Sequence, residues 1–570
     1  MATPSDVSGF YAYMHEFSES VDIWRGQFNR RTGHLESWQV VCYTFSLIFL
    51  VAWIRKITSS EISFFERFNR KSHAMIRNLP WVRPRFDEIL ANTKNLFEEE
   101  THKDDFLREF YKFLPERGLE REDIVREAKQ YALLGNPIIS FQNSTDDRGA
   151  EAIQEVTKIF QNANSPKGIR KMESEVVKMV STMMHAGHGS SGVVTSGNPE
   201  SVLLVYYAAR RKALAESIES PEILLPISAH PVFQHLADMM RFRVVKVPVY
   251  RDDRVDYRRL RRRITSSTAL IVASAPNSTT GTMDDINKIS ELAARYKIPF
   301  HVDASTSGFL LPFLEMADFH QPHIDFRLSG VTSIAVDLHG YGQSTENGSV
   351  LIFKDQSWLK HHTYISTKNR TGVYVSPTLN PNRNASVISA AWATLLSIGR
   401  DGYVDITSQI VTTTRRMAEL MRENKEIEIL GAPELCLIAF RSTAVDTYAL
   451  GEKLIDEGWE LEVGENCLRL PIILEICDDD RISRFIADLK DSVEALVIDK
   501  GYAQECKTAA LHRMIDTSAD QWLVNEILRV RLIAEHSMPP PEQKTRPRTV
   551  SVDGRKMSML GSKPILTQSP

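Results

Sequence analysis

Ile334-Ala335-Val336-Asp337-Leu338-His339-Gly340-Tyr341-Gly342 is the stretch from which the fold of this chain is predicted. Its apolar start is typical of a buried strand, which leads directly into Asp-x-His. Two glycines then flank a tyrosine, which indicates a loop after the strand. Taken alone, the stretch is a strand followed by a loop. The rest of the chain decides which scaffold that strand belongs to.

Length and composition place the chain among globular proteins. Its 570 residues are enough for several domains or one large two-domain core, and 42% are hydrophobic and 25% charged. The formal net charge is -4 and no long basic block occurs, so nucleic acid is not expected as a partner. The five cysteines form no Cys-x-x-Cys pair or Cys/His cluster, which favours reduced thiols over a disulfide framework or a zinc site.

An α/β architecture is predicted from short apolar runs that alternate with helical segments over residues 169–395. We interpret this segment as a large domain with a mainly parallel sheet. Residues 396–510 begin with long helical stretches and then restart the pattern, which predicts a smaller α+β C-terminal domain. The expected strands are 223–228, 242–248, 269–275, 299–303, 333–336 and 349–353 in the large domain, and 427–430, 437–441, 460–463 and 467–472 in the small one.

The N-terminal part contains a candidate transmembrane helix. Residues 38–54 form an uncharged run, with Trp38 and Trp53 near its two ends. Its length is at the short end of the roughly 17–25 residues that a membrane helix needs, and tryptophan is common at membrane interfaces. A buried core helix is the alternative interpretation.

The charges around this run predict its orientation. Basic residues gather directly behind it, over residues 55–77, so residues 1–37 are expected to be lumenal and the bulk of the chain cytosolic. The remaining segments are predicted as a helical arm and linker at 55–168, and as a helix and disordered tail at 511–570.

Polar motifs follow several of the predicted strands in a fixed order. They are Thr195-Ser196-Gly197-Asn198-Pro199-Glu200-Ser201, Ser228-Ala229-His230, Ser274-Ala275-Pro276-Asn277 with 280–285, His301-Val302-Asp303-Ala304, and the segment from Asp337 to Gly342. In this order and spacing they resemble the sphingosine-1-phosphate lyase family of pyridoxal-phosphate enzymes, whose last motif usually reads Asp-x-His-Lys-Tyr-Gly. The resemblance implies the aspartate-aminotransferase-like fold, known as fold type I.

The resemblance also implies a site for pyridoxal 5'-phosphate formed by His230, Asp303, His339, Ser196 and Gly197. A carboxylate beside the ring nitrogen keeps such a cofactor protonated and electron-withdrawing. Asp303 matches the family's aspartate in this role, and His230 matches the histidine that stacks on the ring. From the residues alone, Asp303 is equally suited to an N-cap or turn, and His230 to a surface or capping position.

The phosphate end of the implied site departs from the family pattern. The lyases carry Gly-Gly-Thr-Glu-Ser where this chain has residues 197–201, so Pro199 removes both a hydroxyl and a backbone N–H at the start of a helix. His339 corresponds to a family residue that reaches the cofactor phosphate. Arg383 keeps the arginine of a Ser-Arg-Pro-Gly motif and is expected to bind a substrate phosphate.

The position at which the family binds the cofactor covalently also departs from the family pattern. Gly340 stands where the family has its Schiff-base lysine, and a covalent imine needs a primary amine. A second family lysine corresponds to Glu346, which reverses a charge. Lys354 follows the next predicted strand and is expected to point elsewhere. No residue is therefore assigned as catalytic.

Two functions are compatible with these residues. One is an active lyase that cleaves a long-chain base phosphate to a fatty aldehyde and phosphoethanolamine, supported by the fold and the matched cofactor residues. The other is an impaired or inactive lyase-like protein of sphingolipid metabolism that binds any cofactor non-covalently, favoured by Gly340, Pro199 and Glu346. The resemblance further implies a homodimer or an assembly with a lyase paralogue, a sphingoid base phosphate as ligand, and attachment to the endoplasmic reticulum membrane through residues 38–54.

Overall fold

The computed structural model describes most of the chain between residues 113 and 499. The described residues are 113–132, 150–161, 166–320, 322–344, 348–368, 370, 372–380 and 385–499, with short pieces at 36, 39, 42–47, 50, 79–80, 82–85, 88, 501–502, 506, 509, 512–513, 515 and 528. The chain divides into two compact units, one of residues 1–110 with 213–220 and one of residues 111–212 with 221–570. All of the sheets lie in the second unit.

The predicted membrane run at residues 38–54 lies for the most part outside the described residues, as do the segment before it and the C-terminal tail. Among the residues that are described, no helix combines the length and the apolar character that a bilayer crossing requires.

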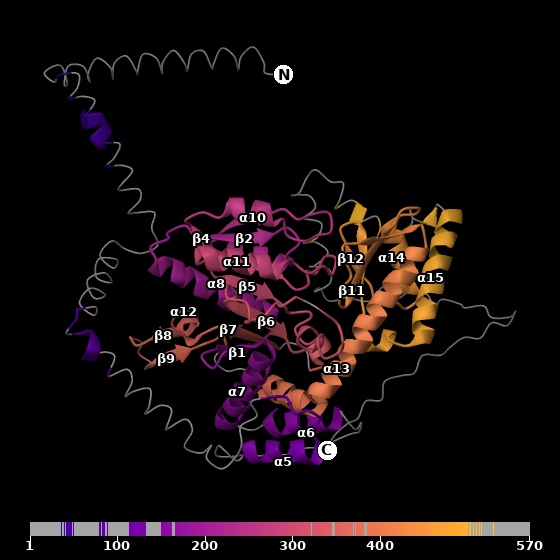
Figure 1. Cartoon of the computed structure of the whole chain (residues 1–570), viewed down its shortest axis with the longest axis horizontal. Coiled ribbons are helices and arrows are strands. Elements are labelled where there is room, and N and C mark those ends of the chain that lie inside the picture. Colours follow the sequence, from indigo (N-terminus) through magenta and orange to yellow (C-terminus); the bar gives the residue numbers. More distant parts are fainter. Residues whose placement is uncertain are drawn as a thin grey trace, which may run out of the picture. The chain divides into compact units, whose positions relative to one another are not determined.

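A seven-stranded mixed sheet forms the centre of the large domain (Figure 1). Its strand order is β1-β7-β6-β5-β4-β2-β3, in which β7 is antiparallel to β1 and β6 and the other neighbours are parallel. The mainly parallel sheet expected from the sequence is thereby confirmed. The strands are β1 (Ser191–Thr195), β2 (Glu222–Pro226), β3 (Arg243–Val247), β4 (Thr268–Ser274), β5 (Phe300–Asp303), β6 (Ser333–Asp337) and β7 (Ser349–Phe353).

Burial on both faces explains the composition of the central strands. Every residue of β2, β4, β5 and β7 is buried. Continuous apolar runs of this kind are typical of strands covered by helices on both sides. β1 is not among the strands expected from the sequence, because Ser191 and Gly192 precede its only two valines. Its antiparallel pairing with β7 places it in the sheet.

Capping side chains determine where several helices of the large domain begin. The carboxylate of Asp256 accepts the N–H of Arg259, and that of Asp285 accepts the N–H of Lys288. The helices are α5 (Arg121–Ala132), α6 (Ala150–Gln161), α7 (Pro166–Met183), α8 (Asn198–Ala215), α9 (Pro231–Met239), α10 (Tyr257–Arg263), α11 (Ile286–Tyr296) and α12 (Leu359–His362). A hairpin of β8 (Tyr364–Ser366) and β9 (Tyr374–Ser376) follows α12.

A long helix, α13 (Ala385–Glu423), leads from the large domain to the small one. Gly399 interrupts it with a φ of 67° and lies between the two helical stretches, 386–396 and 403–424, that the sequence predicts. The small domain contains an antiparallel sheet in the order β10-β11-β13-β12, next to two helices (Figure 1). Its elements are β10 (Ile427–Leu430), β11 (Leu437–Ser442), α14 (Thr447–Asp456), β12 (Glu462–Gly464), β13 (Cys467–Pro471) and α15 (Asp479–Ile498).

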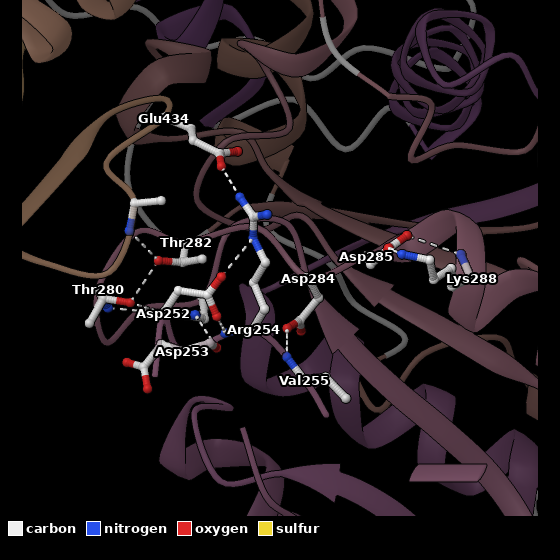
Figure 2. Close-up of polar contacts among 12 residues, drawn as sticks. Asp252, Asp253, Arg254, Val255, Thr280, Thr282, Asp284, Asp285, Lys288 and Glu434 are labelled. Atoms are coloured by element: carbon white, nitrogen blue, oxygen red, sulfur yellow. Dashed lines mark hydrogen bonds and ion pairs between the residues drawn. The ribbon is translucent and has the colours of Figure 1, made fainter. Parts of the chain in front are cut away.

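Polar contacts join loops of the large domain to the loop between β10 and β11 (Figure 2). Arg254 forms an ion pair with Glu434. The hydroxyl of Thr282 accepts a hydrogen bond from the N–H of Ala432 at 2.8 Å. These contacts fix the small sheet against the edge of the large domain near the end of β4.

Candidate functional site

Three of the predicted site segments lie at one edge of the large sheet. β1, β5 and β6 run in the same direction, and their carboxyl ends lead to Ser196, Asp303 and Asp337. In the strand register Asp303 pairs with Ala335, two residues before Asp337, so the two carboxylates lie on the same face of the sheet. In α/β proteins, ligands bind outside the carboxyl ends of the strands. The geometry therefore makes this edge the candidate site.

Asp303 is a buried carboxylate at the end of β5, and the residue is 6% exposed. Its Oδ1 accepts hydrogen bonds from the N–H of Ser305 at 3.2 Å and from the Ser305 hydroxyl at 2.7 Å. Burial raises the pKa of Asp303, while the Ser305 bonds and the charge of His230 act in the opposite direction. A buried carboxylate of this kind is stabilised by a nearby cationic or N–H-bearing group.

His230 lies at the start of α9, close enough to Asp303 for its charge to lower the pKa of that carboxyl. Its Nδ1 accepts the N–H of Val232 at 3.2 Å, so the imidazole is an N-cap. The residue is otherwise exposed. The structure thus shows the capping position that the sequence left open, and the same position keeps the ring beside Asp303.

Asp337 and His339 form a second polar pair at the end of β6. The Nε2 of His339 lies 3.8 Å from Oδ2 of Asp337, while Oδ1 of Asp337 is buried without a hydrogen-bond partner among the described residues. Burial raises the pKa of Asp337 to about 6, aided by the charge of Asp303 and opposed by His339 and Ser349. The edge of the sheet therefore concentrates carboxylates that lack a strong cationic partner.

Gly340 opens the short 3-10 turn that follows. Its φ is +59°, in the left-handed region that favours glycine. A Cβ built on Gly340 would meet no atom within 4 Å, so the space beside it is open. The carbonyl of Gly340 accepts the N–H and the side-chain amide of Gln343, each at 3.0 Å, which fixes the turn.

Two tyrosines, one in the turn and one in α13, fix this turn to the rest of the structure. The hydroxyl of Tyr341 contacts the carbonyl oxygens of Cys436 and Ile472 in the small domain. The hydroxyl of Tyr403 in α13 donates to the carbonyl oxygen of Gly342 at 2.8 Å. The backbone around Gly340 is therefore built as a rigid support even though Gly340 itself carries no side chain.

The loop between β1 and α8 is closed by a carboxylate. Oε2 of Glu200 accepts both the N–H and the hydroxyl of Ser196 at 2.7 Å, and Oε1 accepts the N–H of Leu379 at 2.9 Å. Gly197 has a φ of +120°, and Pro199 contributes no N–H to the first turn of α8. Ser196 thus has its donors occupied by Glu200 in this conformation.

A chain of buried hydroxyls runs from this loop to β7. The hydroxyl oxygens of Thr195 and Ser201 lie 2.7 Å apart, and the Ser201 hydroxyl donates to that of Ser349 at 3.2 Å. Ser349 donates in turn to the carbonyl of Val336 at 3.0 Å. Thr195 and Ser201 belong to a motif recognised in the sequence, but their contacts with Ser349 could not be predicted, because these depend on the register of β1, β6 and β7.

Of three further residues singled out in the sequence, only Lys354 lies among the described residues. Arg383 and Glu346 lie outside the described residues. Lys354 follows β7, and its Nζ donates to the carbonyl oxygens of Leu328 and Ser329 at 3.1 and 2.8 Å. The expectation that Lys354 points elsewhere is confirmed.

Comparisons with known proteins place this geometry in a family. The model of the pyridoxal-dependent decarboxylase conserved domain matches residues 150–443. The chain is 31% identical to sphingosine-1-phosphate lyase 1 of Rattus norvegicus over 527 residues, which cover 89% of this chain and 92% of the relative. It is also 31% identical to the sphingosine-1-phosphate lyase of Drosophila melanogaster over 534 residues, or 90% of this chain and 96% of the relative.

Solved structures show the same relationship. A sphingosine-1-phosphate lyase of Burkholderia pseudomallei is 30% identical, with a TM-score of 0.60 over 73% of this chain and 98% of the other. A glutamate decarboxylase of Lactobacillus brevis is 20% identical, with a TM-score of 0.56 over 69% of this chain and 96% of the other, and is similar in fold alone. These matches confirm the family resemblance carried by the five motifs. The chain belongs to the sphingosine-1-phosphate lyase family, within the pyridoxal-dependent decarboxylases.

Proposed function

We propose that this protein is a lyase-like member of sphingolipid metabolism whose lyase chemistry is impaired or absent. The observation that carries the proposal is Gly340, which the motif resemblance aligns with the cofactor lysine. The family reaction needs a primary amine to bind the cofactor covalently and to move protons. The open space beside Gly340 supports the proposal, because among the described residues no atom lies within 4 Å of a Cβ built there.

A substitute amine is not supplied by the next lysine along the chain. Lys354 is separated from the turn by β7, and its Nζ is engaged by two backbone carbonyls on the 328–329 loop. Moving it to Gly340 would require these bonds to break and the side chain to cross a buried strand.

The residues present fit one end of pyridoxal 5'-phosphate better than the other. Asp303 and His230 offer a buried carboxylate and a neighbouring imidazole for the ring end. At the phosphate end, Pro199 lacks an N–H and the donors of Ser196 are already bound to Glu200. With no amine at Gly340, the most that this site supports is non-covalent binding of the cofactor.

The proposal extends to location and ligands. The protein is attached to the endoplasmic reticulum membrane through residues 38–54, with its main domain in the cytosol. Its ligand is a sphingoid base phosphate, for which Arg383 supplies the phosphate contact. Its partner is a second copy of the chain or a lyase paralogue. The lyase relatives and the predicted apolar run support these points.

The alternative function is an active lyase, and an assay of aldehyde release distinguishes it from the impaired, lyase-like protein. The full chain, purified in neutral detergent, is incubated with pyridoxal 5'-phosphate and a long-chain base phosphate, and the fatty aldehyde is measured. The Drosophila lyase serves as the positive control. We expect aldehyde only in the control; release of aldehyde by this chain at a comparable rate would establish the active enzyme.

A further inference from the structure

A short helix of the large domain consists mostly of arginine. α10 reads Tyr-Arg-Arg-Leu-Arg-Arg-Arg and lies at the outer boundary of the large domain, at the top of Figure 1. Leu260 is its only buried residue, and all of its arginines are exposed. No Asp or Glu occurs between residues 257 and 283, whereas the chain as a whole has a net charge of -4. Positive charge is therefore concentrated on one flank of a slightly acidic chain.

Most of these arginines lack an acidic partner in the fold. The Nε of Arg259 lies 3.4 Å from Oδ2 of Asp256, which caps the helix. Just behind the helix, the carboxylate of Glu222 accepts the hydroxyl of Thr265 and forms an ion pair with Arg243 of β3. Within the described part of the chain, no carboxylate forms an ion pair with the three arginines of the last turn, which are Arg261, Arg262 and Arg263.

The stability of α10 does not explain the cluster. A cation in the last turn interacts favourably with the helix dipole, so one arginine there is expected. Like charges four positions apart destabilise a helix, and Arg258 and Arg262 form such a pair. Arg259 and Arg263 form another. Since the repeated charge weakens the helix that carries it, the cluster points to a partner outside the fold.

The composition of the cluster indicates an anionic lipid surface. Arginine presents a planar fork of N–H groups that matches the oxygens of phosphates and carboxylates, and α10 contains arginine without lysine. Clusters of about four to eight basic residues on a helix are typical of proteins that bind anionic lipids. Tyr250, which precedes the helix, is 46% exposed and offers an aromatic ring of the kind found at bilayer interfaces. The net negative charge of the chain disfavours nucleic acid.

We propose that the arginine surface of α10 docks on an anionic lipid bilayer, with its guanidinium groups on the lipid head groups. The inference deepens the proposed membrane attachment and rests on it for bringing the domain close to the cytosolic leaflet, which carries anionic lipids. α10 returns the chain from the carboxyl end of β3 to the amino end of β4. The contact therefore holds the large domain by its flank, and not by the carboxyl edge that carries Asp303.

Hydrogen exchange of the full chain with nanodiscs tests this contact. One set of discs contains phosphatidylcholine alone, and the other contains phosphatidylcholine mixed with phosphatidylserine. Exchange in the peptide over residues 257–267 should be about threefold or more slower with the anionic discs, because the bilayer covers the helix. High salt should abolish this difference, since it screens exposed charges.

Two triple variants identify the residues responsible. The first changes the last turn of α10, and glutamine keeps the helix propensity of arginine: Arg261→Gln, Arg262→Gln and Arg263→Gln. Its peptide should exchange at the same rate with both kinds of disc. The matched control removes the same charge from exposed residues of α15, where acidic side chains are interspersed, and should keep the wild-type difference: Arg481→Gln, Arg484→Gln and Lys490→Gln.

The outcomes separate this inference from the membrane anchor. Equal exchange of wild-type α10 with neutral and anionic discs would overturn the inference, as would an α10 variant that keeps the full difference. A chain that does not enter neutral discs, but whose α10 is protected by anionic ones, would contradict only the anchor at residues 38–54. Protection by an RNA oligonucleotide, without protection by phosphatidylserine, would overturn the inference in favour of a nucleic-acid surface.

Discussion

The hydroxyl of Tyr341 lies 2.7 Å from the carbonyl oxygen of Ile472 and 3.1 Å from that of Cys436. The residue next to Gly340 is therefore fastened to the small domain. Burial raises the pKa of Tyr341 well above its usual range, so the hydroxyl stays protonated and donates. The turn that lacks the expected lysine is thus tied to the small domain by its second residue.

Tyr341→Phe should destabilise the protein without changing its fold. The substitution removes a hydrogen bond and leaves buried carbonyl oxygens without this donor, which costs about 1–3 kcal/mol. Urea denaturation followed by circular dichroism measures the loss. Tyr364→Phe is the control, because Tyr364 is 51% exposed on the hairpin and its hydroxyl can bond to water. Equal stability of the two variants would contradict the role assigned to Tyr341.

Two glycines with similar backbone angles should respond differently to alanine. Gly340 and Gly281 have φ values of +59° and +71°, so either substitution costs about 1–2 kcal/mol in backbone strain. A Cβ on Gly340 meets open space, whereas one on Gly281 would lie 2.7 Å from the carbonyl oxygen of Leu437. Denaturation midpoints should therefore fall further for Gly281→Ala. A larger loss for Gly340→Ala would show that the space beside Gly340 is filled.

Glu200→Gln should loosen the loop before α8 and the base of the hairpin together. The carboxylate accepts three hydrogen bonds, two from Ser196 and one from Leu379. The neutral amide offers one acceptor oxygen and lacks the charge that strengthens such bonds. Hydrogen exchange at the amides of Ser196 and Leu379 should accelerate in the variant. Exchange that stays at the wild-type rate at both amides would contradict this contact.

The buried carboxyl of Asp284 braces the loops that face the small domain. One oxygen accepts the N–H of Val255 at 2.9 Å (Figure 2), and the other accepts the N–H of Ser274 at the same distance. Burial raises the pKa of Asp284 to about 7, and the charge of Asp253 adds to this effect, while the two hydrogen bonds and Arg254 oppose it. In the unfolded chain the same carboxyl titrates near its ordinary value of 3.8.

This shift predicts a pH dependence of stability. The folded state binds the Asp284 proton more tightly than the unfolded state, so the contribution is fully present below about pH 4 and is lost as pH rises to about 7. Asp284→Asn does not titrate, so its free energy of unfolding should fall less between pH 5 and pH 8 than that of the wild type. The exposed Asp405→Asn is the control and should keep the wild-type dependence. If the free energy of unfolding depended on pH in the same way in all three proteins, the raised pKa of Asp284 would be refuted.

Much of the fold could be predicted because buried strands impose a clear composition. β7 and β10 match their predicted bounds, and β6 differs by one residue. β8 and β9 were not predicted, since three-residue strands with exposed side chains on both faces leave no periodic signal. β1 was not predicted from the sequence, because its pairing with β7 depends on residues far along the chain.

The motifs that end β1, β5 and β6 could be recognised in the sequence, and the departure from the family is clearest where one residue type is indispensable. A missing lysine can be recognised in a sequence because an imine needs an amine, so Gly340 is visible without a structure. The contacts of Glu200 with Leu379 and of Thr195 with Ser349 cannot be recognised in this way. They join residues 179 and 154 positions apart, and no local pattern encodes the register that brings them together.

The central claim is that Gly340 removes the covalent attachment of the cofactor. Its most direct test is borohydride reduction of the full chain after incubation with pyridoxal 5'-phosphate, followed by mass spectrometry of the peptides, with Gly340→Lys treated in parallel. We predict no adduct on any lysine of the wild-type site and an adduct on the introduced lysine of the variant, whose side chain enters open space. A reduced adduct on a native lysine in the wild-type site, together with the visible absorbance of a lysine-bound cofactor, would contradict the account.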